Sequence, residues 1–451
     1  MKILFISLGC DKNLVDSEVM LRILNEKGHQ MTDDEMEADI IIINSCCFVN
    51  DAKEESIQTI LDMARYKEIG NLKALIVTGC LAQRYKEEIF KEIPEVDAIL
   101  GTTSYEEIGE VIDGIMSDSP MERANSKMVM EDLNKLTETV KGRMVTTGGH
   151  FAYLKIAEGC DKHCTYCIIP HIRGKFRSVP MEKVLQEAKQ LAEGGVKELI
   201  LVAQETTLYG KDIYGKKSLH VLLRELCKIS GIQWIRILYC YPEEIYDELI
   251  QVMKEEPKIC HYLDLPIQHA SDNILKRMGR RTSKQELIDI ITKLRTEIPD
   301  ISLRTTLITG FPGETQEDHE ELMDFVDQME FDRLGVFTYS QEEDTPAAMM
   351  PDQIPEEVKE DRQADLMELQ QDIAFDKADS MIGREVLVMI EGKVADENAY
   401  VGRTYKDAPN VDGLIFVNTD EQLVSGDFAR VKVIGAQEYD LIGEIQYEFA
   451  E

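Results

Sequence analysis

The sequence predicts an α/β protein with three parts: an N-terminal doubly wound parallel sheet, a central open (β/α)6 partial barrel and a small antiparallel β-barrel. Strand-then-helix alternation runs through the first 116 residues and resumes near residue 150, and short β-rich pieces follow residue 381. A chain of 451 residues has room for about three domains. Its 43% of hydrophobic residues is enough to fill their cores.

The N-terminal part contains three short and almost wholly apolar runs, KILFISL (2–8), ADIIIIN (38–44) and KALIVTG (73–79). Such runs are typical of parallel strands that are covered on both faces. They predict an α/β domain over residues 1–116. Residues 117–145 lose the alternation and predict a linker.

The central part, residues 146–376, contains six predicted strands separated by five helical segments. The strands are expected at 151–157, 198–203, 233–239, 262–267, 302–308 and 332–339. Six strands are too few for a closed eight-stranded barrel, so we expect an open one. The acidic stretch after Pro355 predicts a connecting helix, and residues 377–451 predict a barrel of about five strands.

Charge and hydropathy restrict the class of protein. The formal net charge is −35, which disfavours binding of nucleic acid. It indicates either a basic partner or a charge that only keeps the protein in solution. We find no apolar run of about 18 residues and no signal peptide, which predicts a soluble cytoplasmic protein without a membrane segment. In that compartment, clustered cysteines favour metal binding over disulfides. Cys227, Cys240 and Cys260 are scattered and predict ordinary buried thiols.

Cys160, Cys164 and Cys167 form a CxxxCxxC motif directly after a predicted strand. Three thiolates on one loop can hold three irons of a [4Fe–4S] cluster and leave the fourth iron open. Zinc would need a fourth ligand, which His163 or His171 could supply. The spacing favours the cluster, because zinc sites usually present two separate cysteine pairs.

Cys10, Cys46 and Cys80 each follow one of the three N-terminal strands, at intervals of 36 and 34 residues. Because the carboxyl ends of parallel strands meet at one edge of a sheet, the three thiols are expected to converge there. They predict a second [4Fe–4S] cluster with an open iron. Spacing alone does not choose between Cys46 and Cys47.

Two further stretches are candidates for ligand binding. Arg173, Lys175 and Arg177 follow the CxxxCxxC motif and could bind anions or tune a cluster, or could form a solvated loop. Gly310 and Gly313 could let the backbone approach a ligand, or could be turn glycines only.

The CxxxCxxC motif, with Tyr166 before its last cysteine, resembles the radical S-adenosylmethionine superfamily. The resemblance implies that the open iron binds the amino and carboxylate groups of S-adenosylmethionine. It also implies reductive cleavage to a 5′-deoxyadenosyl radical, with Cys160, Cys164 and Cys167 as the catalytic set. The stretches VAQETTLYG (202–210) and LITGFPGET (307–315) lie where family members contact the cofactor. They imply cofactor contacts by Tyr166, Gln204, Glu205, Gly310 and Gly313.

The whole pattern resembles the methylthiotransferases: two three-cysteine sites, an α/β front domain, a partial barrel and a last domain similar to TRAM domains. The family's NSC motif (44–46) implies Cys46 as the ligand. The resemblance implies that one S-adenosylmethionine methylates sulfur at the N-terminal cluster. A second is cleaved at the other cluster, and its radical removes hydrogen from the target carbon. An electron donor such as flavodoxin or ferredoxin is implied as well.

Two branches of that family are candidates, one acting on an adenosine of transfer RNA and one on an aspartate of small-subunit ribosomal protein twelve. Residues 377–451 carry 7 Lys or Arg and 15 Asp or Glu, a net charge of −8, which fits a basic protein better than RNA. The strings at 402–413 and 264–281 are similar to the protein-modifying branch. Glu205 departs from it, since many members have Asp there.

These observations predict methylthiolation of the aspartate β-carbon in the ribosomal protein, either free or within the subunit. The alternative is the transfer RNA enzyme. Asp412, Asp420 and Glu421 are expected to be exposed acidic residues that steer the basic partner.

Overall fold

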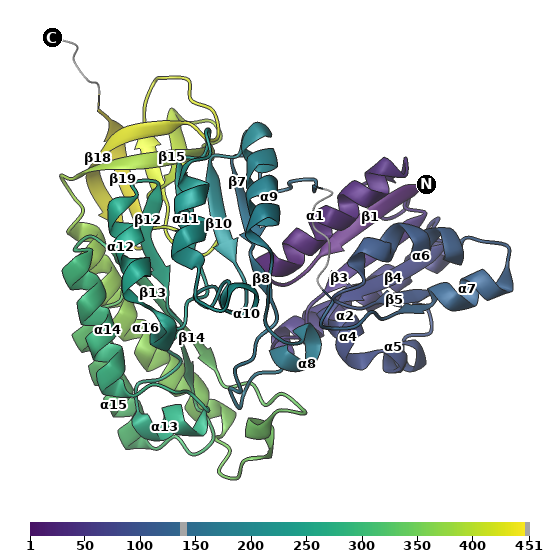
Figure 1. Ribbon diagram of the computed structural model, residues 1–451, viewed down its shortest axis with the longest axis horizontal. Coiled ribbons are helices and arrows are strands. Elements are labelled where there is room, and N and C mark those ends of the chain that lie inside the picture. The colour runs from purple at the N-terminus through teal and green to yellow at the C-terminus, as the bar shows by residue number, and fades with distance from the viewer. Residues whose placement is uncertain (136–141, 447–451) are drawn as a thin grey trace.

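The computed structural model describes residues 1–135 and 142–446, and its first part is a six-stranded sheet in the order β2-β1-β3-β4-β5-β6, with every pair parallel (Figure 1). The strands are β1 (Lys2–Ser7), β2 (Gln30–Met31), β3 (Ile40–Ser45), β4 (Ala74–Gly79), β5 (Ala98–Leu100) and β6 (Met128–Val129). The helices are α1 (Asp11–Glu26), α2 (Asn50–Ala64), α3 (Tyr66–Ile69), α4 (Cys80–Tyr85), α5 (Glu87–Glu92), α6 (Ile108–Ile115) and α7 (Pro120–Ser126).

Helices cover both faces of this sheet, which confirms the doubly wound fold. Ile41 and Ile43 pack with α2 and α4 on one face, and Ile40 and Ile42 pack with α1 and α6 on the other. This alternation explains why the runs are apolar at every position. The three predicted strands are β1, β3 and β4, which are neighbours in the sheet.

The segment predicted as a linker, 117–145, contains regular structure. It includes α7 and β6, and β6 extends the sheet by pairing with β5, for example through the Gly101 N–H that donates to the Val129 carbonyl at 3.0 Å. The prediction missed these elements because a two-residue strand carries no periodic signal. Residues 136–141 of that segment lie outside the described residues.

The central sheet has the order β14-β13-β12-β11-β10-β7, all parallel, and stays open between β7 and β14, as predicted. Its strands are β7 (Phe151–Lys155), β10 (Glu198–Val202), β11 (Trp234–Ile237), β12 (Ile259–Asp264), β13 (Ser302–Thr309) and β14 (Arg333–Thr338). A small ribbon, β8 (Ala157–Glu158) and β9 (Arg177–Ser178), flanks α8 (Ile169–Arg173).

Helices cover the outer face of the central sheet (Figure 1). They are α9 (Met181–Glu193), α10 (Lys211–Tyr214), α11 (Leu219–Cys227), α12 (Asp247–Glu255), α13 (Asp272–Arg277), α14 (Lys284–Glu297) and α15 (Gln316–Met329). Helix α16 (Glu356–Asp379) is the predicted connecting helix and leads to the last domain. Across residues 1–135 and 142–446, no helix combines the length and the apolar character needed to span a bilayer.

The C-terminal domain is a closed five-stranded barrel in the order β15-β16-β17-β19-β18. Its strands are β15 (Glu385–Lys393), β16 (Ala399–Arg403), β17 (Ile415–Asn418), β18 (Phe428–Gln437) and β19 (Asp440–Ile445). One pair, β17 with β19, is parallel, whereas the sequence predicted an antiparallel barrel throughout. The difference arises because β19 returns between β17 and β18 to close the barrel.

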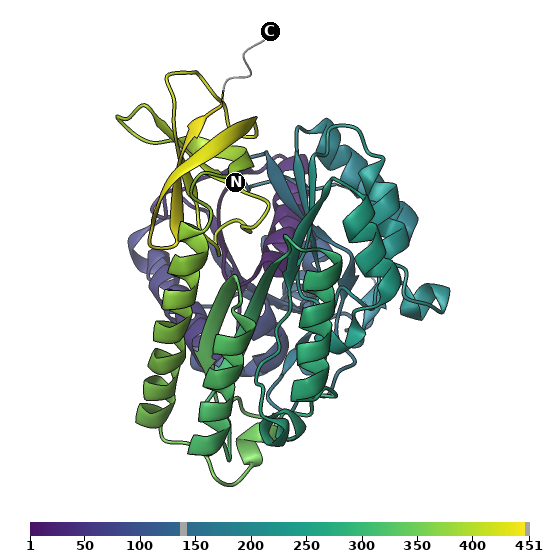
Figure 2. The same ribbon diagram turned by 90° about the vertical axis from the view of Figure 1, so that its left-hand side faces the viewer.

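The C-terminal barrel packs on the end of the central sheet where the strands begin (Figure 2). Arg403, 1% exposed at its side chain, donates to Glu198 at the start of β10 at 2.7 Å, and Arg236 donates to the same carboxylate at 2.8 Å. The loop after β16, residues 404–414, runs from this contact toward the central sheet.

Asp412, on that loop, is not the exposed residue that the sequence predicted. Its side chain is 1% exposed, accepts from the Tyr262 hydroxyl at 2.7 Å and faces Arg304 at 3.6 Å. Asp412 is drawn inward because β12 and β13 of the central sheet offer it these partners.

Candidate iron–sulfur and cofactor site

Cys10, Cys46 and Cys80 follow three neighbouring strands, β1, β3 and β4, at the same edge of the N-terminal sheet. Cys10 lies close enough to the other two that it adds to the rise that burial causes in the pKa of Cys46 and of Cys80. Gly9 has a φ of +86°, and a Cβ placed on it would lie 2.9 Å from the Cys46 Sγ. A side chain on Gly9 would therefore fill the space between the end of β1 and Cys46.

Cys46 and Cys47 face different surroundings. Cys46 lies beside Gly9, at the end of β1, and is 6% exposed, whereas Cys47 is fully buried in the apolar cluster beneath α2 and α4, which also contains Cys80. Burial raises the pKa of Cys47 to about 12, and that of Cys46 is raised for the same reason. The orientation supports Cys46 as the third member of the N-terminal triad.

Arg173 joins the N-terminal triad from the other domain. Its guanidinium lies 3.5 Å from the Cys80 Sγ, 2.9 Å from Asp16 and 3.2 Å from Glu158, and it also donates to Asn13. Burial opposes its charge, but the neighbouring Cys80, Glu158 and Asp16 hold the pKa of Arg173 well above its usual value. The same burial raises the pKa of Cys80, and Arg173 acts against that rise.

Cys160, Cys164 and Cys167 lie on the loop between β8 and α8. Cys160 and Cys164 are buried and Cys167 is half-buried. The loop is fixed by its backbone, since the Cys160 N–H donates to the Gly174 carbonyl and the Cys167 N–H donates to the Cys164 carbonyl, both at 3.1 Å. Burial raises the pKa of Cys160 to about 11 and also raises that of Cys167.

Gln204 and Glu205 lie at the end of β10, beside this loop. Gln204 accepts the Gly159 N–H at 2.8 Å and donates to Glu158 at 2.6 Å, so it orients the start of the cysteine loop. Glu205 is fully buried and its Oε1 accepts from Thr207, while its Oε2 has no partner within the described chain. Burial raises its pKa to about 8. Glu205 shares with Cys160 and Lys162 the lining of a cavity of about 330 Å³.

Tyr166, Gly310 and Gly313 are near the cysteine loop in different ways. The Tyr166 ring packs edge-on against Phe311, with centroids 6.5 Å apart. Gly310 and Gly313 both have a positive φ, but a Cβ on them would meet the side chains of Lys359 and Arg277. Packing within the protein explains these glycines, and their role in binding the cofactor stays a prediction.

The fold places the three cationic residues after the motif in different surroundings. Lys175 is exposed, Arg177 donates to the carbonyls of Arg173 and Lys175, and Arg173 faces the N-terminal triad instead of the nearby loop. His163 and His171, the possible zinc ligands, are both exposed.

The donor sets fit iron–sulfur clusters. Within residues 1–135 and 142–446, no three His, Cys, Asp or Glu side chains are grouped as ligands of a single ion. A [4Fe–4S] cluster binds each thiolate through a different iron, so its ligands stand farther apart than those of one ion. Each triad offers thiols that are mostly buried, with Arg173 beside one and a cavity beside the other.

Several residues around the two triads were missed by the sequence analysis. The Tyr239 hydroxyl donates to Asp11 at 2.9 Å, and the Lys12 ammonium lies 3.2 Å from the centre of the Tyr239 ring. The Tyr241 hydroxyl lies 3.8 Å from the Cys164 Sγ. The signal was the string LYCY (238–241) at a predicted strand end, which places two aromatic rings at the same edge as the cysteine loop.

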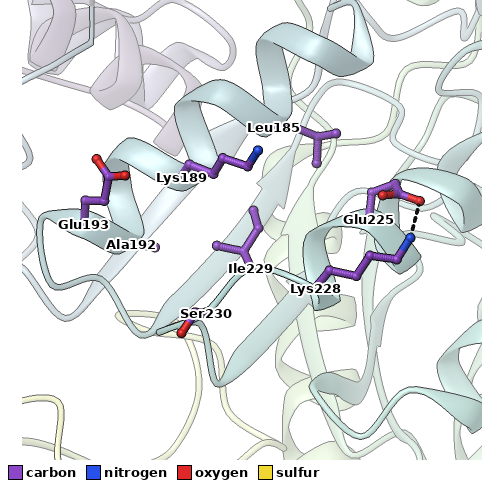
Figure 3. Close-up of a pocket in the computed structure, with 8 residues that line it drawn as sticks. All are labelled: Leu185, Lys189, Ala192, Glu193, Glu225, Lys228, Ile229 and Ser230. Carbon is purple, nitrogen blue, oxygen red and sulfur yellow. Dashed lines mark hydrogen bonds and ion pairs between the residues drawn. The ribbon is translucent and has the colours of Figure 1, made fainter.

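Ion pairs between the domains bring the two triads to a common junction, where α4 packs against α8 and α1 packs against β7. Arg143 pairs with Glu18 at 2.6 Å, Lys155 pairs with Asp16, and Arg84 pairs with Glu342 at 3.0 Å. By contrast, the depression between α9 and α11 lies on the outer surface of the barrel and contains none of the predicted site residues (Figure 3).

Three family matches cover most of the chain. Residues 2–101 match the Uncharacterized protein family UPF0004, residues 154–326 match the Radical SAM superfamily, and residues 382–445 match the TRAM domain. The matches coincide with the N-terminal sheet, most of the partial barrel and the C-terminal barrel.

Solved structures share the fold at low sequence identity. The radical S-adenosylmethionine methyltransferase TsrM from Kitasatospora setae has a TM-score of 0.55 and 12% identity, over 77% of each chain. The cobalamin-dependent S-adenosylmethionine radical enzyme OxsB has a TM-score of 0.51 and 14% identity, over 82% of this chain and 56% of its own. These likenesses concern the fold alone.

Curated relatives are similar over the whole length. The ribosomal protein uS12 methylthiotransferase RimO of Lachnoclostridium phytofermentans is 67% identical, over 98% of this chain and 99% of its own. The enzyme of the same name from Clostridioides difficile is 50% identical over 100% of both chains. With this identity across all three domains, the chain belongs to the RimO family of radical S-adenosylmethionine methylthiotransferases.

Proposed function

We propose that this enzyme adds a methylthio group to the β-carbon of an aspartate in ribosomal protein uS12. It would use S-adenosylmethionine and two [4Fe–4S] clusters, one at each cysteine triad. The observation that carries the proposal is the junction of the two domains, where Arg173 contacts Cys80 of one triad and its neighbour Gly174 contacts Cys160 of the other. Sulfur held at one triad and a radical formed at the other would thus lie on either side of one short segment, residues 173–174.

When bound, the clusters and S-adenosylmethionine supply the electrons, the sulfur, the methyl group and the carbon radical. The chain provides the surroundings. Gln204 and Gly174 hold the Cys160 loop in place. Glu205, with its pKa raised to about 8 by burial, is mostly protonated at pH 7 and can donate a hydrogen bond into the cavity beside Cys160. A radical is required because no side-chain base usefully deprotonates an unactivated β-carbon.

The choice of uS12 as substrate rests on charge as well as on the relatives. Asp420 and Glu421 are exposed on the C-terminal barrel, whose sequence carries a net charge of −8. Such a surface complements a basic ribosomal protein and repels RNA. We also propose a cytoplasmic location, because ribosomal proteins are made there, and a flavodoxin or ferredoxin as electron donor.

We propose that the three domains divide the work. Residues 1–116, together with α7 and β6 from the segment 117–145, would form the sulfur-holding domain. Residues 146–376 would form the S-adenosylmethionine domain, and residues 377–451 the substrate-gripping barrel. The direct contact of Arg173 with Cys80 supports assigning the first two roles to adjoining domains.

The test is incubation of anaerobically reconstituted enzyme with uS12 and, separately, with transfer RNA, followed by mass spectrometry. We expect a methylthio group on one aspartate of uS12 and none on RNA. Replacing Cys160, Cys164 and Cys167 by Ala should halve the iron and abolish 5′-deoxyadenosine. Replacing Cys10, Cys46 and Cys80 should spare 5′-deoxyadenosine and stop methylthiolation. Modified RNA, or full iron content in either variant, would contradict the proposal.

A further inference from the structure

Arg173 belongs by sequence to the S-adenosylmethionine domain but reaches into the sulfur-holding domain. It ends α8, six residues after Cys167, and its residue exposure is only 2%. Its Nη2 lies 3.5 Å from the Cys80 Sγ and also contacts Asn13, while its Nη1 lies 2.9 Å from Asp16. Three of its partners, Cys80, Asn13 and Asp16, therefore come from the N-terminal domain.

The same short segment also holds the other triad. The carbonyl of Gly174, the next residue, accepts the N–H of Cys160 at 3.1 Å. Arg173 contacts Glu158 at 3.2 Å, Glu158 accepts from Gln204 at 2.6 Å, and Gln204 accepts the Gly159 N–H at 2.8 Å. Cys80 is thus linked to Cys160 in two ways, and both pass through Arg173. One runs along the chain to Gly174, and the other runs through Glu158 and Gln204 to Gly159.

We propose that Arg173 is a positioning residue that ties the two triads together and places a positive charge on the N-terminal cluster. This inference rests on the proposed function, because it requires a cluster at Cys10, Cys46 and Cys80. Groups that contact cluster ligands tune the cluster's potential, and a fixed geometry is needed where reacting atoms must meet. A guanidinium suits this place because its planar fork can serve several buried acceptors at once.

Two substitutions separate the charge from the bridge. Arg173→Gln removes both the charge and most of the contacts. Arg173→Lys keeps a charge, but a single ammonium cannot reach Cys80, Asn13, Asp16 and Glu158 together. Arg143→Gln is the matched control, because the Arg143 side chain is also buried, at 2% exposure, and also crosses the junction of the two domains, but it pairs with Glu18 at 2.6 Å and Glu187 at 2.9 Å and not with a cysteine.

The first measurement uses the full-length chain with Cys160, Cys164 and Cys167 replaced by Ala, so that only the N-terminal cluster remains. A nearby cation favours the reduced, more negative cluster. Arg173→Gln should therefore shift the midpoint potential to a more negative value and alter the electron paramagnetic resonance spectrum of the reduced cluster. Arg173→Lys should restore most of the potential, and Arg143→Gln should leave both readouts unchanged.

The second measurement uses the enzyme with both triads intact and compares 5′-deoxyadenosine with methylthiolated uS12. The loss of a residue that supports cluster ligands typically lowers activity by about 10- to 100-fold, so Arg173→Lys and Arg173→Gln should raise the ratio of 5′-deoxyadenosine to product by that order. If Arg173→Gln fails to fold, the ratio in Arg173→Lys decides alone.

The inference would be overturned if the variants retained iron and two readouts stayed as in the wild type. These readouts are the potential in Arg173→Gln and the ratio of 5′-deoxyadenosine to product in both Arg173 variants. The proposed function fails in a different way: the chain lacking Cys160, Cys164 and Cys167 would then bind no iron at all. The two failures are therefore distinguishable.

Discussion

Glu205 shows how burial controls a single carboxyl group. Its pKa is raised from 4.5 to about 8 by burial, with Thr207 and Lys162 opposing the shift. Between these two pH values the folded chain holds a proton that the unfolded chain has released. Stability contributed at this position therefore falls as pH rises from about 4.5 to 8 and levels off above that range.

We predict that Glu205→Gln removes this dependence in the apo protein. The melting temperature of the variant should exceed that of the wild type by an amount that grows between pH 5 and pH 8. Each pKa unit corresponds to about 1.4 kcal/mol, so the effect is large enough for a thermal melt. Glu205→Asp, which retains a carboxyl group, serves as control and should still lose stability as pH rises. A difference between wild type and Glu205→Gln that stays constant over this range would contradict the prediction.

The two adjacent cysteines give a second prediction at the scale of the residue. Cys46→Ala should remove the cluster of the N-terminal triad, because its thiol faces Gly9 and the end of β1. Cys47→Ala should keep that cluster and lower stability only, because Cys47 is fully buried and the space beside Gly9 is lined by Cys46. Iron per chain and the melting temperature measure the two effects. Equal iron loss in both variants would show that Cys47 also serves as a ligand.

At the scale of the element, the loop after β16 depends on buried charge. Arg403 donates to Glu198 and Glu391 at 2.7 and 2.6 Å, and all three residues are mostly buried. Removing one partner of a buried ion pair typically costs about 3–5 kcal/mol. The cost should be smaller here, because Arg236 and His150 also contact the two carboxylates. This contact should therefore contribute to holding the C-terminal barrel on the central sheet, together with the Arg333–Asp407 pair and the packing of Trp234 on Phe428.

We predict that Arg403→Met lowers the melting temperature and makes the C-terminal barrel sensitive to limited proteolysis. Arg430→Met is the control, since Arg430 lies on β18 of the same barrel but is exposed. The control should leave the proteolytic pattern unchanged. Equal cleavage of both variants would indicate that the barrel is held by other contacts.

The elements also show what the sequence can and cannot predict. Strands β1, β3 and β4 were predictable because parallel strands that are covered on both faces must be apolar throughout, and the cysteines at their ends followed from the parallel arrangement. Strand β6 was missed because its two residues have no pattern of their own and depend on pairing with β5. Local sequence reports the burial of a strand, but a short edge strand is specified by its neighbour.

Long-range partners account for the remaining errors. Asp412 was expected to be exposed, but Tyr262 and Arg304, more than 100 positions earlier in the chain, draw it inward. Arg173 was expected to serve the nearby CxxxCxxC loop, but it contacts Cys80, 93 residues away. Both residues are charged, and a charge in a sequence gives no indication of which distant counter-charge it will meet.

At the scale of the whole molecule, the net charge of −35 implies electrostatic steering of a basic substrate. We predict that Asp420→Lys combined with Glu421→Lys slows association with uS12 and weakens its dependence on salt, because charges at the rim of an interface act mainly on the association rate. Stopped-flow or surface-based kinetics at two salt concentrations would measure this.

The control for that prediction is Glu87→Lys with Glu88→Lys, the same change of charge on the exposed face of α5. A slower association with only the barrel variant would identify the barrel as the docking surface. Equal slowing by both variants would mean that net charge alone steers the partner.

The salt bridges at the domain junction also bear on how the chain is made. Asp16 and Glu18 lie on the first helix, yet their cationic partners Arg143, Lys155 and Arg173 come more than 120 residues later. During synthesis, α1 leaves the ribosome long before these cations do, and its acidic face stays hydrated until β7 and α8 emerge. We therefore expect the N-terminal domain to complete its surface only when the next domain begins to fold, so that the junction between the two cysteine triads forms late.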